Sequence, residues 1–221
     1  MNKYYLLLLL TPFIAFVSCD KEDDNLEEKE VLANCTYFKV REGTTFTYDY
    51  LDGNVQTAEV IEKQDVDGND LILFRSSNGD ESYLNCDGEM MIFTAEEATT
   101  LNNEVTIKNI KMDLDLSGEI EDEKLIATIN NTQSVNGYTF TQTVKYYGKV
   151  VARDMSMEVG GMNYSDVVEY HIRTTNTVSG LDIPTSNSKY YFAPEVAYIQ
   201  WESRDTGGTI IGGGELREYV Y

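Results

Sequence analysis

Apolar and polar residues alternate along most of this chain, and that alternation constrains its fold more than any other feature. It is regular in TFTYDY at 45–50, in IKMDLDL at 110–116 and in YTFTQTVKY at 138–146. Successive side chains of a β-strand point to opposite faces, so a strand with one buried and one solvated face has a period of two. The sequence therefore predicts a mainly β protein of half-buried antiparallel strands.

Turn pairs that contain glycine separate these segments at short intervals. They are Asp52-Gly53, Asp67-Gly68, Asn78-Gly79, Asp87-Gly88, Asn136-Gly137, Gly160-Gly161 and Gly207-Gly208. Such pairs accept the positive φ angles that tight hairpin turns require. Their spacing indicates a meander of about ten strands or more, and not a series of βαβ units.

Two short segments favour helix instead. One is 26–32, where Asn25 is a candidate N-cap, and the other is 95–101, where Thr94 and Glu97 have the spacing of a capping box. We therefore expect one or two short helices beside the sheet, and the second would be a candidate lid.

The first eighteen residues have the order of a secretory signal peptide. Lys3 supplies a positive start, an apolar stretch follows up to Val17, and the small residue Ser18 precedes Cys19. The stretch is shorter than the ~20 residues that a membrane-spanning helix needs. The sequence predicts that residues 1–18 are removed.

The end of this segment, Phe16-Val17-Ser18-Cys19, resembles the lipobox of bacterial lipoproteins. In that family cleavage occurs before the cysteine, between Ser18 and Cys19 here, and the cysteine carries acyl chains. One departure is Phe16, where the family usually has leucine. The resemblance implies a lipid anchor at Cys19. A plain signal peptide with an incidental cysteine is the alternative.

An acidic segment follows the cysteine at once, as Asp20, Lys21, Glu22, Asp23 and Asp24. Because such a stretch cannot bury a core, residues 19–34 are predicted to be a lipidated, solvated tether. The run after the cysteine also resembles the surface-export signal of Bacteroidota lipoproteins. That resemblance implies an outer-membrane protein that faces the cell exterior. A simple spacer is the alternative.

The remaining residues, 35–221, are predicted to form a single antiparallel β domain. The charge of the chain limits its partners. The chain has 38 acidic residues against 17 basic ones, a formal net charge of −21. Such a chain repels phosphate backbones, so we expect no nucleic-acid partner.

Two cysteines remain beside Cys19. Outside the cytoplasm, Cys35 and Cys86 could form a disulfide. Two reduced, partly buried thiols are the alternative, since separation in sequence does not fix the Cα distance that a disulfide needs.

Three stretches resemble an uncharacterised family of Bacteroidota lipoproteins sometimes labelled TapB-like. They are TYFKVREGTTFTYDYLDGNVQTAEV at 36–60, MEVGGMNYSDVVEYHI at 157–172 and KYYFAPEVAYIQWES at 189–203. In the last stretch Glu195 and Ala197 stand where the family pattern has glycines. The resemblance implies a strongly curved antiparallel meander sheet, a half-barrel similar to lipoprotein carriers such as LolA and LppX. It implies no catalytic residue.

Catalytic and metal-binding signals are scarce. The chain has one histidine, His171, with no nucleophile motif. The acidic run at 65–70 departs from a calcium loop at its sixth position, Asp70, and is better interpreted as a charged hairpin turn. The glycines at 212–214 lack the lysine of a phosphate loop and indicate a bulge or bend in a strand. We therefore expect no enzyme, no cofactor and no metal site.

The leading functional hypothesis is a non-enzymatic module that binds a hydrophobic or lipid ligand on the concave face of the sheet. Tyr190, Phe192, Tyr198 and Trp201 are the candidate ligand-lining residues, with core packing as the alternative for strand aromatics. A second hypothesis is an adhesion module that contacts glycan or an envelope protein. A hydrolase is the third, and it would need a cleft with converging titratable groups.

Overall fold

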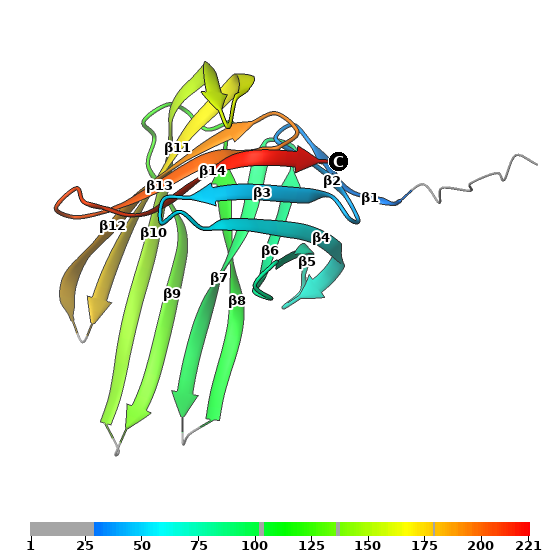
Figure 1. Cartoon of the computed structure of the whole chain (residues 1–221). Helices are drawn as coiled ribbons and strands as arrows, with labels where there is room; N and C mark the ends of the chain where they lie inside the picture. The colour runs from blue at the N-terminus through cyan, green and yellow to red at the C-terminus, as the bar shows by residue number, and fades with distance from the viewer. Residues whose placement is uncertain (1–28, 102–103, 136–137, 179) are drawn as a thin grey trace, which may run out of the picture.

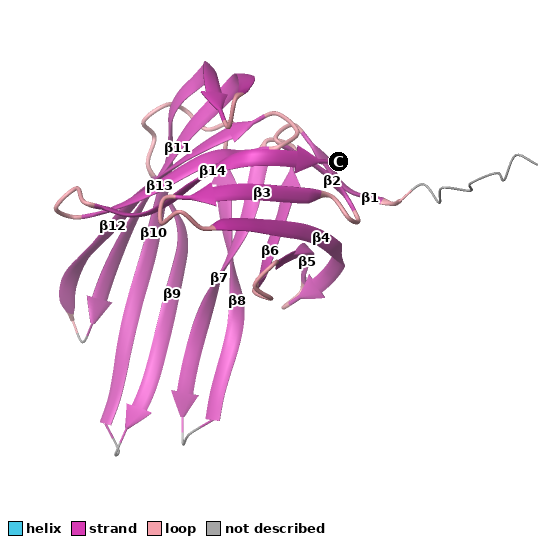
Figure 2. Cartoon of the chain, viewed as in Figure 1, coloured by secondary structure: helices cyan, strands magenta, loops and turns pink. Residues whose placement is uncertain are grey.

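The computed structural model describes residues 29–101, 104–135, 138–178 and 180–221. These residues form strands and turns, without a helix (Figure 2). The strands are β1 (Val31–Cys35), β2 (Phe38–Arg41), β3 (Thr45–Tyr50), β4 (Val55–Val66), β5 (Asn69–Ser76), β6 (Glu81–Asp87), β7 (Met90–Leu101), β8 (Glu104–Asp115), β9 (Lys124–Val135), β10 (Tyr138–Val159), β11 (Met162–Val178), β12 (Leu181–Ala193), β13 (Ala197–Asp205) and β14 (Ile210–Val220).

The main sheet closes on itself, which corrects the half-barrel expectation. Its ring follows the order β6-β5-β4-β3-β14-β13-β12-β11-β10-β9-β7, and β7 pairs again with β6. The last contact of the ring is short, because β7 meets β9 in parallel only at Thr99 and Thr100. Side chains extend this seam: the amide of Ala98 donates to Asn131 Oδ1 at 2.7 Å. Closure leaves no unpaired edge at β6, the kind of edge that otherwise recruits other chains.

The predicted turns explain the meander. Gly53, Gly68, Gly79 and Gly88 all have positive φ angles between consecutive strands from β3 to β7. The acidic run at 65–70 is the β4–β5 hairpin, in which the amide of Gly68 donates to Asp65 Oδ1 at 2.9 Å. The turn chemistry is therefore confirmed at these positions, and Asn136-Gly137 lies outside the described residues.

The helix expectations are wrong where the structure tests them. Residues 95–101 continue β7, in unbroken register with β8. Cross-strand pairs such as Glu97 opposite Lys108 stabilise this hairpin more than an isolated capping box stabilises one turn of helix. No lid exists there. Of the other segment, 26–28 lie outside the described residues, while β1 starts at Val31, inside the expected tether.

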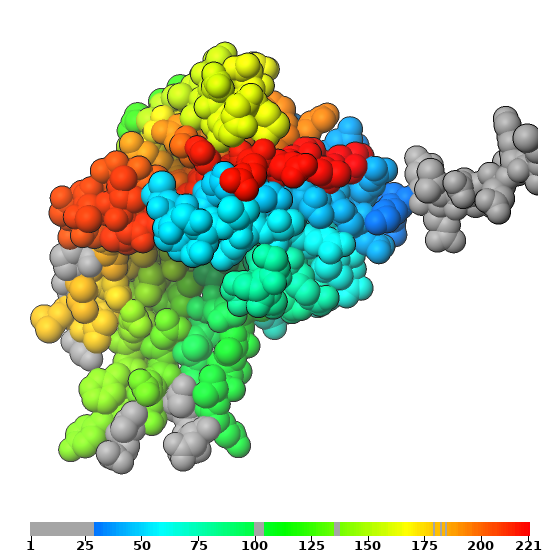
Figure 3. Space-filling view, in the orientation of Figure 1, coloured from blue at the N-terminus to red at the C-terminus, as the bar shows by residue number. Residues whose placement is uncertain are grey.

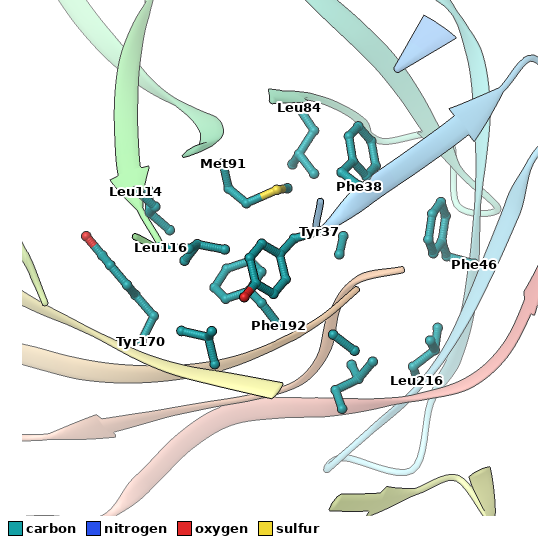
Figure 4. Close-up of a cluster of buried hydrophobic side chains, with 14 of the residues drawn as sticks. Tyr37, Phe38, Phe46, Leu84, Met91, Leu114, Leu116, Tyr170, Phe192 and Leu216 are labelled. Atoms are coloured by element: carbon teal, nitrogen blue, oxygen red, sulfur yellow. The ribbon is translucent and has the colours of Figure 1, made fainter. Parts of the chain in front are cut away.

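A separate two-stranded hairpin, β1–β2, plugs one end of the barrel. Its Phe38 and Val40 are fully buried. Figure 4 shows Tyr37 and Phe38 among side chains that come from the barrel wall. The core around them includes Phe46, Leu84, Met91, Leu114, Leu116, Phe192 and Leu216. We call this region, formed by β1–β2 and the strands around it, the plugged end.

The plug is fastened to the barrel on two sides. On one side a disulfide joins Cys35 to Cys86 of β6, with a Cα–Cα distance of 6.2 Å. On the other side, the amide of Lys39 donates to the carbonyl of Glu195, and the amide of Ala197 donates to the carbonyl of Tyr37. Glu195 and Ala197 both have positive φ, 65° and 66°. These are the two positions where the family pattern has glycines, so the turn keeps a glycine-like backbone without glycine.

At the other end, three hairpins project beyond the plugged core. Figure 1 shows β7–β8, β9–β10 and β11–β12 pointing to the same side of the molecule, below β3 and β4. We call the described distal parts, residues 95–101, 104–110, 126–135, 138–146, 174–178 and 180–188, the hairpin end. In the space-filling view the surface recedes beneath β3 and β4, above these hairpins (Figure 3).

Candidate functional site

The four predicted aromatic residues lie together inside the barrel. Phe192 is fully buried, and Phe93 of β7 packs against Tyr190, Phe192 and Tyr198 with ring centroids 6.2 Å away in each case. Trp201 stacks on Tyr190 at 6.4 Å. These five residues form an aromatic layer across the interior, between the plugged end and the hairpin end. Their rings largely contact one another, as strand aromatics in a core do.

The space on the plugged side of this layer is small. A cavity of about 40 Å³ is lined by apolar side chains that include Phe46, Phe74 and Tyr198. A water needs roughly 10–15 Å³ by this measure, so the cavity has room for a few water-sized groups and none for an acyl chain. The plug therefore fills the concave face at this end.

The tyrosines of this region are held in their neutral form. Burial raises the pKa of Tyr198 and of Tyr190, and it raises the pKa of Tyr48 well above its ordinary value. The Tyr48 hydroxyl donates to the carbonyl of Tyr198 at 3.1 Å. These hydroxyls act in packing and hydrogen bonding, because ionising them would place a charge in an apolar interior.

The glycine run predicted to be a bulge or bend makes room for Trp201. A Cβ at Gly212 would lie 3.4 Å from the indole ring, and one at Gly214 would lie 3.1 Å from its Nε1. The strand stays in register with β13 through this run and pairs with β3 from Gly214 onwards, and the bulge lies beside the run, between the pairs Ser203–Gly212 and Arg204–Ile210. The glycines therefore serve close approach between β14 and the indole ring.

The hairpin end has an inner face that is only partly covered: Ile129 is 2% exposed, whereas Val144 and Asn176 are half-buried. Val144 of β10 lies opposite Ile129 of β9 and Asn176 of β11 in the register. Opposite residues of antiparallel strands share a face, so these three lie on the face of Tyr146, which packs against the core. Gln142 continues this face one step towards the hairpin tips. We call Ile129, Gln142, Val144 and Asn176 the inner wall.

The inner wall combines apolar surface with two polar groups that lack partners. Asn176 Oδ1 is buried and accepts no hydrogen bond from any described residue. The Gln142 amide likewise has no hydrogen bond within the described part of the chain. A buried acceptor without a partner costs about 1–3 kcal/mol, so its persistence calls for a physical explanation. Because this oxygen is closed to solvent, a ligand hydroxyl or amide along the wall would reach it once the half-buried Asn176 side chain rotates.

Titratable groups converge on one depression of about 190 Å³, whose lining includes Asp113, Asp115, Glu119, Asp122, Lys124 and Lys149. The single histidine is not among its lining residues. His171 Nε2 lies 2.6 Å from Glu169 Oε1 on the opposite face from Tyr170, so the histidine belongs to a surface pair. Hydrogen bonds from the Ser117 hydroxyl lower the pKa of Asp115, and those from Arg173 lower the pKa of Glu123. Carboxylates of this kind stay ionised. Within the described residues, no three His, Cys, Asp or Glu side chains are arranged to hold a metal ion.

The predicted targeting residues lie outside the described residues. These are the signal segment with Ser18, the lipidation site Cys19 and the acidic run from Asp20 to Asp24. Among the residues that are described, none belongs to a helix long and apolar enough to cross a membrane.

The sequence predicts only part of the inner wall. The alternation of 138–146 puts Gln142 and Val144 on one face. It carries no signal for the neighbours of that face, because the register with Ile129 and Asn176 is fixed by hairpin turns and by bulges such as that between Tyr146 and Tyr147. Two unpartnered amide side chains on one wall follow from the register alone.

Comparisons with known proteins assign no family. No family model matches the chain, and no curated protein matches it. Among solved structures, a candidate lipoprotein from Parabacteroides distasonis is 14% identical with a TM-score of 0.48. A candidate exported protein with a YmcC-like fold from Bacteroides fragilis is 8% identical with a TM-score of 0.47. Each alignment covers 85% of this chain and 100% of the other. At this level the likeness assigns no function, and the TapB-like relation stays a prediction.

Proposed function

We propose that this chain is a lipid-anchored lipoprotein of the outer membrane, exposed at the cell surface, that binds a hydrophobic or lipid ligand without catalysing a reaction. The observation that carries the binding role is the inner wall, where the half-buried Val144 lies opposite Asn176, whose Oδ1 is buried and unpartnered among the described residues. The ligand lies along this wall, between the projecting hairpins and below the aromatic layer. The plugged end, with its cavity of about 40 Å³, takes no part in binding.

Chemistry of the wall suggests the kind of ligand. An acyl chain would cover the half-buried Val144, with a gain of about 25 cal/mol for each Å² of apolar surface removed from water. A hydroxyl or amide close to the chain would donate to Asn176 Oδ1 after a rotation of that side chain. We therefore favour a lipid with a polar group next to its chain, such as a hydroxylated or amide-linked acyl chain.

The location rests on the N-terminal sequence. The signal segment, Cys19 and the acidic run support export, lipidation and surface exposure. Metabolic labelling with a radioactive fatty acid tests the anchor, which requires label in the wild type and none in Cys19→Ala. Protease accessibility on intact cells tests the exposed orientation.

Native mass spectrometry of the mature protein from its own host's membranes tests the binding role. A reproducible extra mass beyond the acyl anchor, removed by denaturation, is the expected result. In vitro, we expect a dansylated undecanoic acid to bind saturably. Val144→Asp should weaken this binding at least tenfold, because it places a charge on the wall.

Thr143→Asp provides the matched control, since it places the same charge one residue away, on the opposite face of β10. It should change the affinity less than twofold. Equal effects of the two substitutions, or no saturable binding to the wild type, would contradict the proposal. Circular dichroism of both variants confirms that they fold.

A second candidate function is adhesion to a glycan, favoured by the outer face of β10–β12. There Lys145, Tyr147 and Thr175 border a depression of about 410 Å³. Lys145 has no acidic partner among the described residues. Calorimetric titration with carboxylated and neutral oligosaccharides tests this candidate, and Tyr147→Ala should abolish any binding found.

A further inference from the structure

Large apolar side chains stand exposed on the distal parts of three separate hairpins. They have between 45% and 73% of their surface accessible, and we call them the rim: Val105, Ile107, Tyr138, Phe140, Leu181 and Ile183. Two come from β8, two from β10 and two from β12. Because these hairpins project to the same side (Figure 1), the rim is one end of the molecule and not a scatter of surface residues. Exposed apolar groups gathered in this way mark an interaction surface.

The rim lies in the part of the chain with the fewest charges. No charged residue occurs between Ile126 and Val144, and Asp182 is the only one between Thr174 and Ser188. The β7–β8 hairpin has Glu96, Glu97 and Glu104 against Lys108, and with Lys145 and Asp182 the hairpin end has a formal net charge of −2. The formal net charge of −21 is therefore carried mostly by the rest of the molecule. A weakly charged apolar end on an acidic protein fits an apolar or zwitterionic partner, whereas a basic protein would bind elsewhere.

The predicted anchor brings a lipid surface within reach. Cys19 and Val31 are twelve residues apart, which allows a span of up to about 40 Å in an extended chain. The predicted anchor therefore keeps the domain close to a lipid bilayer.

We propose that the rim enters the interfacial layer of a lipid bilayer and docks the hairpin end on the membrane. Aromatic rings such as those of Tyr138 and Phe140 favour this layer, where one edge is apolar and the other is wet. Docking is shallow, because a spanning strand needs about 9–11 residues with a lipid-facing apolar side and each hairpin offers only its distal residues. The docked rim places the inner wall at the membrane surface, so this inference deepens the proposed function and rests on it for the role of docking.

Vesicle flotation tests the docking directly. The mature chain carrying Cys19→Ser has no acyl chain, so any binding comes from the fold. We expect it to float with phosphatidylcholine vesicles. Val105→Ser with Ile107→Ser should lower the partition coefficient at least fivefold, because both are exposed rim residues of β8, at 63% and 53%. The matched control is Leu51→Ser with Ile211→Ser, because these side chains are 64% and 60% exposed at other sites. The control should partition as the parent does.

The outcomes separate docking from ligand binding. Val105 and Ile107 lie on β8, outside the closed ring that contains the inner wall, so the rim variant should bind the dansylated fatty acid as the parent does. Docking is overturned if the parent fails to float or if both variants partition equally. It is also overturned if light scattering shows a dimer that only the rim substitutions dissociate, because the rim would then cover a second copy. Loss of fatty-acid binding by Val144→Asp, with flotation retained, supports both proposals as separate events.

Discussion

The two ends of the barrel are built from the same strands and differ in what occupies their interior. At the plugged end, the inward side chains of the wall meet Phe38 and Val40, which are fully buried. At the hairpin end, Ile129 of β9 is also buried, but Val144 and Asn176 on the same face are only half-buried, and Asn176 Oδ1 has no partner among the described residues. The barrel wall alone therefore does not determine whether the interior is filled. The β1–β2 hairpin, which lies outside the closed sheet, fills the interior at one end only.

Alkaline pH should have the largest effect on stability, because it ionises buried tyrosines. Burial raises the pKa of Tyr48, Tyr170 and Tyr198, and it raises that of Tyr219 to about 12. Since the folded pKa lies above the unfolded value of about 10, the stability is complete below pH ~10 and is lost as the pH rises towards the folded values. We expect cooperative unfolding above pH ~10. Tyrosinate absorbance and circular dichroism should change together, and tyrosinate absorbance that rises fully before the fold is lost would contradict this.

Removing one ring from each end should sharpen the contrast. Phe38→Ala should cost about 3–5 kcal/mol, because the ring packs 6.0 Å from that of Phe74 and its loss leaves a cavity. Phe140→Ala should cost less than about 0.5 kcal/mol, because half of that side chain is already exposed. Urea unfolding of both variants measures the difference. Similar costs would mean that the hairpin end has a core of its own.

Cutting the covalent link of the plug tests how far it stabilises the barrel. The double substitution Cys35→Ser and Cys86→Ser should lower the free energy of unfolding by about 2–4 kcal/mol, because the disulfide joins residues 51 apart and restricts the unfolded chain. Reductant should shift the unfolding midpoint of the wild type and leave that of the double variant unchanged. A wild type whose unfolding midpoint does not change with reductant would show that the disulfide contributes little to holding the plug in the barrel.

The smallest effect concerns the turn that holds the plug from the other side. Glu195→Gly should raise stability by about 0.5 kcal/mol, since glycine removes the cost of a positive φ and its greater unfolded-state entropy offsets part of the gain. The loss of the Lys39–Glu195 pair, 3.7 Å apart and exposed, weighs little. The melting temperature should rise by about 1–2 °C. Glu195→Ala keeps the strain, so a rise there too would assign the effect to the carboxylate.

The sequence predicted strand identity and turn positions well, because both are local properties. Alternation assigned β3, β8 and β10, and glycine pairs marked the turns between them. Closure could not be predicted, because the seam depends on the long-range contact of Thr99–Thr100 with β9. The helix expected at 95–101 failed for the same reason: a capping-box spacing is local, whereas the pairing of β7 with β8 extends over the whole strand.

The candidate site was harder to predict than the fold. The aromatic residues between 190 and 201 are the predicted ligand-lining residues, but their rings pack into a layer with Phe93. The residues of the inner wall form no sequence motif, and only the register of the strands brings them together. Asn176 has no distinctive sequence context, and only the register of β10 with β11 puts it opposite Val144.

The disulfide also determines how the molecule carries mechanical load. In a chain held at its N-terminus, any pull from flow or from a bound partner enters the fold through β1. Without a cross-link, that force would draw the plug out by shearing its non-covalent contacts. The bond from Cys35 to Cys86 diverts the tension into β6, a member of the closed ring. A force on the N-terminal tether therefore acts on the barrel wall, and the plug stays packed inside the barrel.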